Sequence, residues 1–371
     1  MKHSKIHVPG FSGSYEEDDI TFLLKEVALA PTPVGAKEAA IQSGNRHYSE
    51  MISEEARPDA RYLAIFRQAW ADGRERIARE VAAIGATIRE MIAGGDLPPQ
   101  VTLCSLVRAG APLGVLLRRE LADAGVDVAH FGVSIIRDRG LDMNAMRHVM
   151  ALRDPAGILF VDGWTGKGAI ARELRRSWRG ETGRDPILVV LADPCGEADL
   201  SGSHEDWLIP SGILGANISG LISRSILNSG LIGPADFHGY VPVTHLADID
   251  FSRAFVDDIH GLMRAIGAGK GRARRSGTGD LADNPQRQAA QDHVASIMVK
   301  FGITNANRVK PGIAEATRAV LRRAPERVLL RARDDSDLAA LIHLCEAGRI
   351  PHTVDPGLTG PYRAITLISK A

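Results

Sequence analysis

The segment from residue 158 to residue 170 combines an apolar strand, a carboxylate and a glycine-rich turn. Four apolar residues precede Asp162, and a helix is expected from residue 169. The turn between them consists of Thr165, Gly166, Lys167 and Gly168. Ligands of α/β sheets bind at the carboxyl ends of strands, where glycines let backbone N–H groups surround a phosphate. Asp162 suits a sugar hydroxyl or Mg²⁺, so the segment predicts a sugar-phosphate site, with a generic strand–turn–helix connection as the alternative.

Two further loops follow apolar strands. Residues 106–114 place Arg108 and Gly110 in a small-residue turn, where backbone amides and a guanidinium can hold an anion. The alternative is a plain turn with Pro112 in the first turn of a helix. Residues 192–196 place Asp193 and Cys195 at a strand end, where a turn built from Asp, Pro and Gly is also expected.

Two polar clusters lie outside these loops. Residues 42–52 bring together Arg46, His47 and their polar neighbours, which could grip a phosphate and close over a site as a lid. An exposed, capped helix start is the alternative. Residues 219–225 combine small residues with Arg224, and a second anion site and a packed helix are equally compatible with them.

The elements that must position these residues alternate between strand and helix. A helix of period 3.6 is predicted at 62–93, and strands at 101–107, 128–136, 157–161 and 187–192. Such alternation is typical of an α/β fold with a parallel sheet, and right-handed crossovers would gather the strand ends on one edge.

Composition places the chain among ordinary globular proteins. It has 371 residues, 44% of them hydrophobic, and no net charge, which favours two or three domains and argues against indiscriminate nucleic-acid binding. Three scattered cysteines without zinc-type spacing predict no disulfide framework and no metal ligands, as in a reducing cytoplasm. No leader-like segment and no run of 18 apolar residues is found, so we expect a cytoplasmic protein without a membrane span.

A change of composition divides the chain. Residues 264–291 are rich in Gly, Ala and Arg and lack an apolar period, which indicates a basic flexible linker. The predicted organisation is therefore a large α/β domain at 1–265, a linker at 266–292 and a small domain at 293–371.

At the loops around Asp162 and Arg108, the chain resembles the type I phosphoribosyltransferases. That resemblance implies that Asp162 takes the ribose hydroxyls and that residues 165–168 take the 5′-phosphate. Arg108 and Gly110 would take the pyrophosphate of phosphoribosyl pyrophosphate (PRPP), with Mg²⁺ accompanying it. Gly163 stands where that family usually has a second acid.

A resemblance over nearly the whole chain is to the StiP family. It rests on residues 11–15, 21–24, 42–52, 161–168, 209–211 and 219–224. This group is phosphoribosyltransferase-like, is associated with bacterial tellurium resistance and stress, and often carries a pelota-type RNA-binding domain. Some descriptions call it a cysteine protease. That activity would need a thiol beside a histidine. Cys195, with His204 nearby in sequence, and Cys104, inside an apolar strand, are the candidates.

Residues 309–371 resemble the pelota fold. A helix is expected at 309–323 with Pro311 and Gly312 at its start, then a strand at 327–331, a helix at 336–347 and a strand at 351–354. The resemblance implies that structured RNA is contacted by Gly312, Glu315, Arg318 and Arg322. A protein-docking module is the alternative.

Together these features predict a phosphoribosyltransferase-like enzyme that acts on a ribose 5-phosphate or nucleotide-type substrate in a stress pathway, joined to an RNA-binding domain. Positioning and charge stabilisation would carry such a reaction. A cysteine protease and a non-catalytic nucleotide sensor with an RNA-binding tail are the alternatives.

Overall fold

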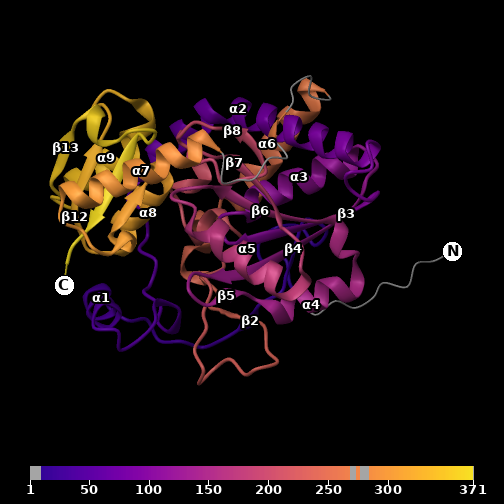
Figure 1. Ribbon diagram of the computed structural model, residues 1–371, viewed down its shortest axis with the longest axis horizontal. Helices are drawn as coiled ribbons and strands as arrows, with labels where there is room; N and C mark the ends of the chain where they lie inside the picture. The colour runs from indigo at the N-terminus through magenta and orange to yellow at the C-terminus, as the bar shows by residue number, and fades with distance from the viewer. Residues whose placement is uncertain (1–9, 268–272, 276–283, 371) are drawn as a thin grey trace.

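The computed structural model describes residues 10–267, 273–275 and 284–370. A large unit is built on a mostly parallel sheet, and a smaller α/β unit lies beside it at the carboxyl end (Figure 1). The predicted α/β class, with a parallel sheet and a small second α/β unit, is confirmed. No helix in the described part of the chain is long and apolar enough to cross a membrane.

The large sheet has the strand order β1-β4-β3-β6-β7-β8-β10. Its strands are β1 (Thr21–Phe22), β4 (Asp127–Ile136), β3 (Gln100–Val107), β6 (Ile158–Trp164), β7 (Ile187–Ala192), β8 (Leu200–Ser203) and β10 (Arg274–Arg275). All neighbours pair in parallel except β10 with β8, and β5 (Gly140–Leu141) also pairs antiparallel with β4. The carboxyl ends of β3 and β6 therefore lie next to each other, as the strand pattern predicted. A separate pair joins β2 (Lys25–Glu26) to β9 (Gly239–Tyr240).

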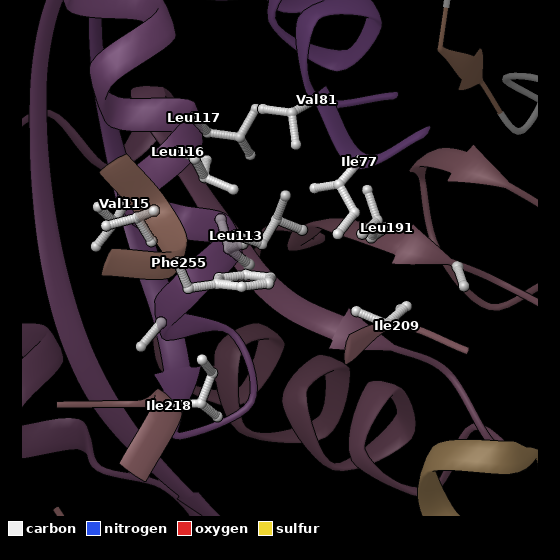
Figure 2. Packing of buried hydrophobic residues seen from close by; sticks show 14 of the residues in the cluster. Ile77, Val81, Leu113, Val115, Leu116, Leu117, Leu191, Ile209, Ile218 and Phe255 are labelled. Carbon is white, nitrogen blue, oxygen red and sulfur yellow. The ribbon is translucent and has the colours of Figure 1, made fainter. Parts of the chain in front are cut away.

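Helices cover both faces of this sheet (Figure 1). One face carries α2 (Ala60–Ala93), α3 (Ala111–Asp123) and α6 (Ser252–Ile266), and the other carries α4 (Met143–Leu152) and α5 (Ala169–Thr182). Figure 2 shows Ile77 of α2, Leu116 of α3 and Phe255 of α6 meeting in the first layer. The second layer includes Phe160 against Trp178, with ring centroids 5.1 Å apart. The helix predicted at 62–93 is confirmed, and it begins where the Asp59 side chain accepts a hydrogen bond from the Tyr62 amide at 2.7 Å.

The smaller unit contains a four-stranded sheet in the order β11-β14-β12-β13. The strands are β11 (Val309–Pro311), β14 (Ala364–Ile368), β12 (Pro325–Leu330) and β13 (His352–Val354), and the helices are α7 (Pro285–Lys300), α8 (Ile313–Arg322) and α9 (Ala339–Ala347). The prediction of a helix from residue 309 was wrong for its first residues. Val309–Pro311 is a buried strand paired with β14, and the helix starts only after Gly312.

The segment predicted as a linker is partly structured. Helix α7 begins at Pro285, inside the predicted 266–292 segment, because the Asn284 side chain accepts hydrogen bonds from the Gln286 and Arg287 amides at 3.0 and 3.4 Å. The first residues of α7 are mostly polar, so no apolar period indicated where the helix begins. Residues 268–272 and 276–283 of the predicted linker lie outside the described residues.

The remaining described helix, α1 (Val34–Gln42), precedes the polar cluster at 42–52 and lies below the smaller unit in Figure 1.

Candidate functional site

A cavity of about 370 Å³ lies where the carboxyl ends of β3 and β6 meet helix α8 of the smaller unit. Two acidic side chains, Asp162 and Glu315, line it. Its cationic lining side chains are Lys37, Arg108, Arg137, Lys167, Arg224, Lys310, Arg318, Arg322 and Arg323. Such an excess of cations over acids in one cavity is suited to an anionic ligand.

The glycine-rich turn forms one wall of this cavity. Thr165 donates its hydroxyl hydrogen bond to Asp193 at 2.5 Å, and its amide donates to the Ala192 carbonyl at 2.9 Å. Asp193 also accepts from the amides of Glu197 at 3.0 Å and Ala198 at 2.9 Å, so one buried carboxylate holds two adjacent strand-end loops together. The segment predicted as a turn at 192–196 thus supplies Asp193, which holds Thr165 beside the cavity.

Asp162 lines the cavity at the end of β6. The Gly163 amide donates to its carboxylate at 2.8 Å. Burial nevertheless raises the pKa of Asp162 to about 7, with the Gly163 amide and the Arg318 guanidinium acting in the opposite direction. At neutral pH this carboxyl group can therefore either hold a proton or accept one, and in both states it can bind a hydroxyl.

Arg108 and Arg224 are held by backbone carbonyls and acids at the cavity. Arg108 forms an ion pair with Glu55 and donates to the Ile222 carbonyl at 2.6 Å. Arg224 donates to the Tyr48 carbonyl at 2.7 Å. One N–H group on each guanidinium, Nε of Arg108 and Nη1 of Arg224, is buried without an acceptor within the described ranges. Burial and neighbouring guanidinium groups lower the pKa of Arg224 to about 10. Buried donors of this kind call for an acceptor that the described protein atoms do not supply.

Other predicted binding residues lie elsewhere. Gly110 does not line the cavity. A Cβ there would lie 2.1 Å from the Val161 carbonyl oxygen, so this glycine permits close packing of the loop on β6. Arg46 bonds the Glu50 carbonyl at 3.0 Å, and His47 bonds the Ser49 hydroxyl at 2.8 Å. Neither lines the cavity, so the structure does not bring them to the glycine-rich turn.

Sequence reasoning missed several lining residues, among them Lys37, Tyr48 and Arg137. Tyr48 stood inside the polar cluster but was not singled out; its hydroxyl accepts from the Arg137 amide at 2.9 Å, and its ring lies under Arg224. Lys37 lies on helix α1, and no spacing pattern marks it. Burial lowers its pKa to about 8, with Arg224 contributing.

The residues predicted to face RNA are turned toward the large unit. Glu315, Arg318 and Arg322 line the cavity. Gly312 does not line it and lies beside Asp206 of the large unit. Arg318 donates to the Gly212 carbonyl at 3.2 Å and lies 4.6 Å from the centroid of the Trp164 ring. Burial lowers the pKa of Arg318, and the nearby Arg322 adds to this effect. The helix start of the smaller unit is therefore part of an inter-domain site.

Lys167 connects the glycine-rich turn to the smaller unit. Its ammonium group donates to the carbonyls of Ala306 and Val309, the second at 2.8 Å. Burial lowers the pKa of Lys167 to about 7, opposed by Glu315. Its charge is therefore sensitive to pH near neutrality.

The cysteines are packed rather than activated. Cys104, Cys195 and Cys345 are all buried and free. Burial raises the pKa of the Cys195 thiol well above its ordinary value, and the adjacent Asp193, 4.0 Å from the sulfur, raises it further. Burial also raises the pKa of Cys104. Among the described residues no histidine hydrogen-bonds a cysteine, and a protease nucleophile requires such a partner or another source of thiolate.

The described ranges contain no group of three or more His, Cys, Asp or Glu side chains arranged to hold a metal ion. In the cavity, both acids, Asp162 and Glu315, lie next to the glycine-rich turn, and cationic side chains line much of the rest of its wall.

These features define an α/β protein with a cation-lined cavity at its strand ends, bordered by a small carboxyl-terminal domain. A family model described as tellurite-like stress resistance cysteine protease StiP matches residues 13–260, and a PELOTA RNA binding domain model matches residues 288–370. A curated protein of Acinetobacter baylyi, named cysteine protease StiP, is 43% identical over 372 residues, covering 97% of this chain and 95% of the relative. The chain belongs to the StiP family, as its motifs predicted.

Two solved structures share a limited likeness with the chain. The hypoxanthine phosphoribosyltransferase of Trypanosoma cruzi is 17% identical, over 36% of this chain and 82% of the enzyme, with a TM-score of 0.28. A lysine-to-arginine variant of that enzyme, complexed with the product IMP, is 17% identical over 37% and 73% of the two chains, with a TM-score of 0.29. These TM-scores are too low to establish a shared fold. The family and the Acinetobacter relative are both described as cysteine proteases, which agrees with the protease alternative predicted from the sequence rather than with the predicted transferase.

Proposed function

We propose that this protein is an enzyme that binds a ribose 5-phosphate or nucleotide-type ligand in the cavity between its two units and acts at the ribose. The observation that carries the proposal is the pair of buried guanidinium N–H groups without acceptors, on Arg108 and Arg224, both of which line the cavity. A phosphate group supplies the charged acceptors that such donors require. The cationic lining on all sides supports the same ligand class.

Each part of the site has a role in this proposal. The backbone of residues 165–168 would bind the 5′-phosphate, and Asp162 would bind the ribose hydroxyls. In a transfer at the anomeric carbon, the bond from that carbon to a leaving diphosphate breaks while a bond to the acceptor forms. Arg108 and Arg224 would stabilise the charge that develops on the leaving oxygens. No covalent protein nucleophile is needed for this chemistry.

Mg²⁺ is expected with a PRPP-type ligand, but the side chains of the cavity do not form a suitable set of Mg²⁺ ligands. Mg²⁺ takes oxygen ligands in an octahedron. The cavity offers Asp162 and, from the other unit, Glu315, whose nearest cationic partner is Lys310 at 3.4 Å. The site therefore fits a phosphate better than a bare divalent cation.

Isothermal titration of the full chain with ribose 5-phosphate tests this proposal. Arg224→Gln removes one unsatisfied donor, and we expect binding to weaken about 10- to 100-fold, because hydrogen bonds between charged groups contribute about 1.5–3 kcal/mol. Arg57→Gln is the matched control, since Arg57 is exposed and pairs with Asp248 away from the cavity. Equal heats for wild type, Arg224→Gln and the control would contradict the proposal.

A cysteine peptidase is the second candidate. The family description and the name of the Acinetobacter relative favour it. Cys195 also borders a second cavity, of about 720 Å³, next to Arg172 and Tyr362. A peptidase would need a rearrangement that exposes this thiol and lowers its pKa. Peptide hydrolysis that is lost in both Cys195→Ala and Cys195→Ser would establish this candidate, whereas hydrolysis that survives in either variant would exclude Cys195 as the nucleophile.

Structured RNA is the proposed macromolecular partner of the smaller unit, on the strength of the PELOTA match at residues 288–370. Contacts to RNA phosphates would make the affinity fall as salt rises. We place the protein in a stress-resistance pathway, as the family description indicates.

A further inference from the structure

We infer that helix α8 is a wall of the small-ligand site: the carboxyl-terminal domain contributes ligand-binding cations to the cavity, and a bound phosphate ligand and an RNA exclude each other from this helix face. This inference rests on the anion binding proposed above and adds the part of the chain that completes the site. It assigns to Lys310 and Arg322 a role in binding a compact polyanion such as a diphosphate.

Hydrogen bonds dock the two units against each other around the cavity. Asp206 of the large unit accepts from the Ile313 amide at 3.0 Å and from the Arg363 amide at 2.7 Å. It therefore satisfies one of the free N–H groups at the start of α8. Tyr362 donates to the Gly166 carbonyl at 3.0 Å, so the smaller unit contacts the glycine-rich turn itself.

The charges on α8 and its preceding strand are poorly compensated by protein atoms. Lys310 is 7% exposed, and its acid partner, Glu315, is 3.4 Å away. Arg322 and Arg108 both pair with Glu55, and the Arg322 guanidinium lies 3.7 Å from the Glu55 carboxylate. Burial lowers the pKa of Arg322 to about 10, and Arg108 contributes to that shift. Cations from two units thus share one acid, and an anion in the cavity would relieve their repulsion.

The same contacts cover the helix start that a pelota-type domain would offer to RNA. Gly312 faces Asp206, Arg318 is bonded to the Gly212 carbonyl, and Glu315 faces Gly166. An RNA strand can reach these residues only if the two units separate. Because a ligand held by both units opposes that separation, binding to the two partners must be coupled with opposite sign.

Titration of the full chain with inorganic pyrophosphate separates this inference from the proposed function. We expect Lys310→Gln and Arg322→Gln each to weaken binding at least 10-fold, while Arg333→Gln, on an exposed residue of the same domain, leaves it unchanged. No binding by the wild type would contradict the proposed function. Wild-type binding that both variants retain in full would overturn the inference alone.

A second variant tests docking without removing a cavity charge. Asp206 does not line the cavity, so Asp206→Asn should weaken pyrophosphate binding several-fold only if the ligand spans both units. A fluorescent hairpin RNA supplies the complementary readout: we expect tighter RNA binding by Asp206→Asn than by wild type, and weaker binding by wild type when pyrophosphate is saturating. Circular dichroism confirms that the variant is folded. RNA binding that ignores pyrophosphate, or no RNA binding by either protein, would overturn the mutual exclusion.

Discussion

Replacing Gly166 by alanine should disturb the boundary between the two units rather than the fold of either one. A Cβ at this position would lie 2.0 Å from the Glu315 carboxylate and 3.3 Å from the Pro311 carbonyl oxygen. The carboxylate can move, because it is the end of a flexible side chain. It must then leave its position beside Lys310, the buried partner at 3.4 Å.

The magnitude follows from that ion pair. At 3.4 Å and an effective dielectric constant of about 20, the Coulomb attraction between Lys310 and Glu315 is about 5 kcal/mol. The Glu315 side chain is 27% exposed, so solvent screens the pair and a displaced carboxylate keeps part of the attraction. We therefore expect Gly166→Ala to lower the free energy of unfolding by about 1–2 kcal/mol, with a fall of a few degrees in the midpoint temperature. Pyrophosphate binding should weaken as well, because the displaced carboxylate moves within the cavity.

Thermal unfolding and pyrophosphate titration of the same variant test this reasoning. Gly180→Ala is the control, since a Cβ at that position in α5 meets no atom within 4 Å and should raise helix stability by about 0.5–1 kcal/mol. Wild-type stability together with wild-type affinity in Gly166→Ala would refute the contact between the glycine-rich turn and α8.

Three other predictions follow from the site. Gly110→Ala should lower the free energy of unfolding by urea by about 1–3 kcal/mol, because its Cβ would meet the backbone of β6 at 2.1 Å; an unchanged midpoint would show that the loop can shift. Sulfate, whose charge is constant between about pH 5 and 9, should bind more weakly as pH rises through 7, since Asp162 (pKa raised to about 7) gains a negative charge and Lys167 (pKa lowered to about 7) loses a positive one. Asp162→Asn should flatten this dependence, and a flat wild-type profile would contradict it. Iodoacetamide should label Cys195 at least about 10-fold more slowly than a free thiol, because burial disfavours the thiolate; rapid selective labelling would support the peptidase candidate instead.

The parallel sheet and its strand-end loops could be predicted because their signals are local. Apolar runs mark β3 and β6, and parallel pairing of neighbouring strands brings Arg108 and Asp162 to the same edge. The glycine-rich turn before α5 was equally visible, as glycine and threonine precede an amphipathic helix.

The other half of the site could not be predicted, because it depends on contacts between distant parts of the chain. Glu315 meets Gly166 across some 150 residues, and no periodicity within either segment reports that contact. The pelota resemblance predicted that the start of α8 contacts RNA, whereas in the structure Glu315, Arg318 and Arg322 line the cavity shared with the large unit. Lys37 lies on a short helix without a strong apolar face, so no sequence pattern marked it. Gly110 was predicted to contact the ligand, whereas in the structure it packs against β6.

A crystal structure of the full chain soaked with ribose 5-phosphate is the most direct test of the central claim. We expect the phosphate against the backbone of residues 165–168, the ribose hydroxyls beside Asp162, and new hydrogen bonds from Arg108 Nε and Arg224 Nη1, the two donors that are now buried without acceptors. Crystals that bind the sugar phosphate elsewhere, or that leave both guanidinium donors unchanged at saturating ligand, would contradict the account.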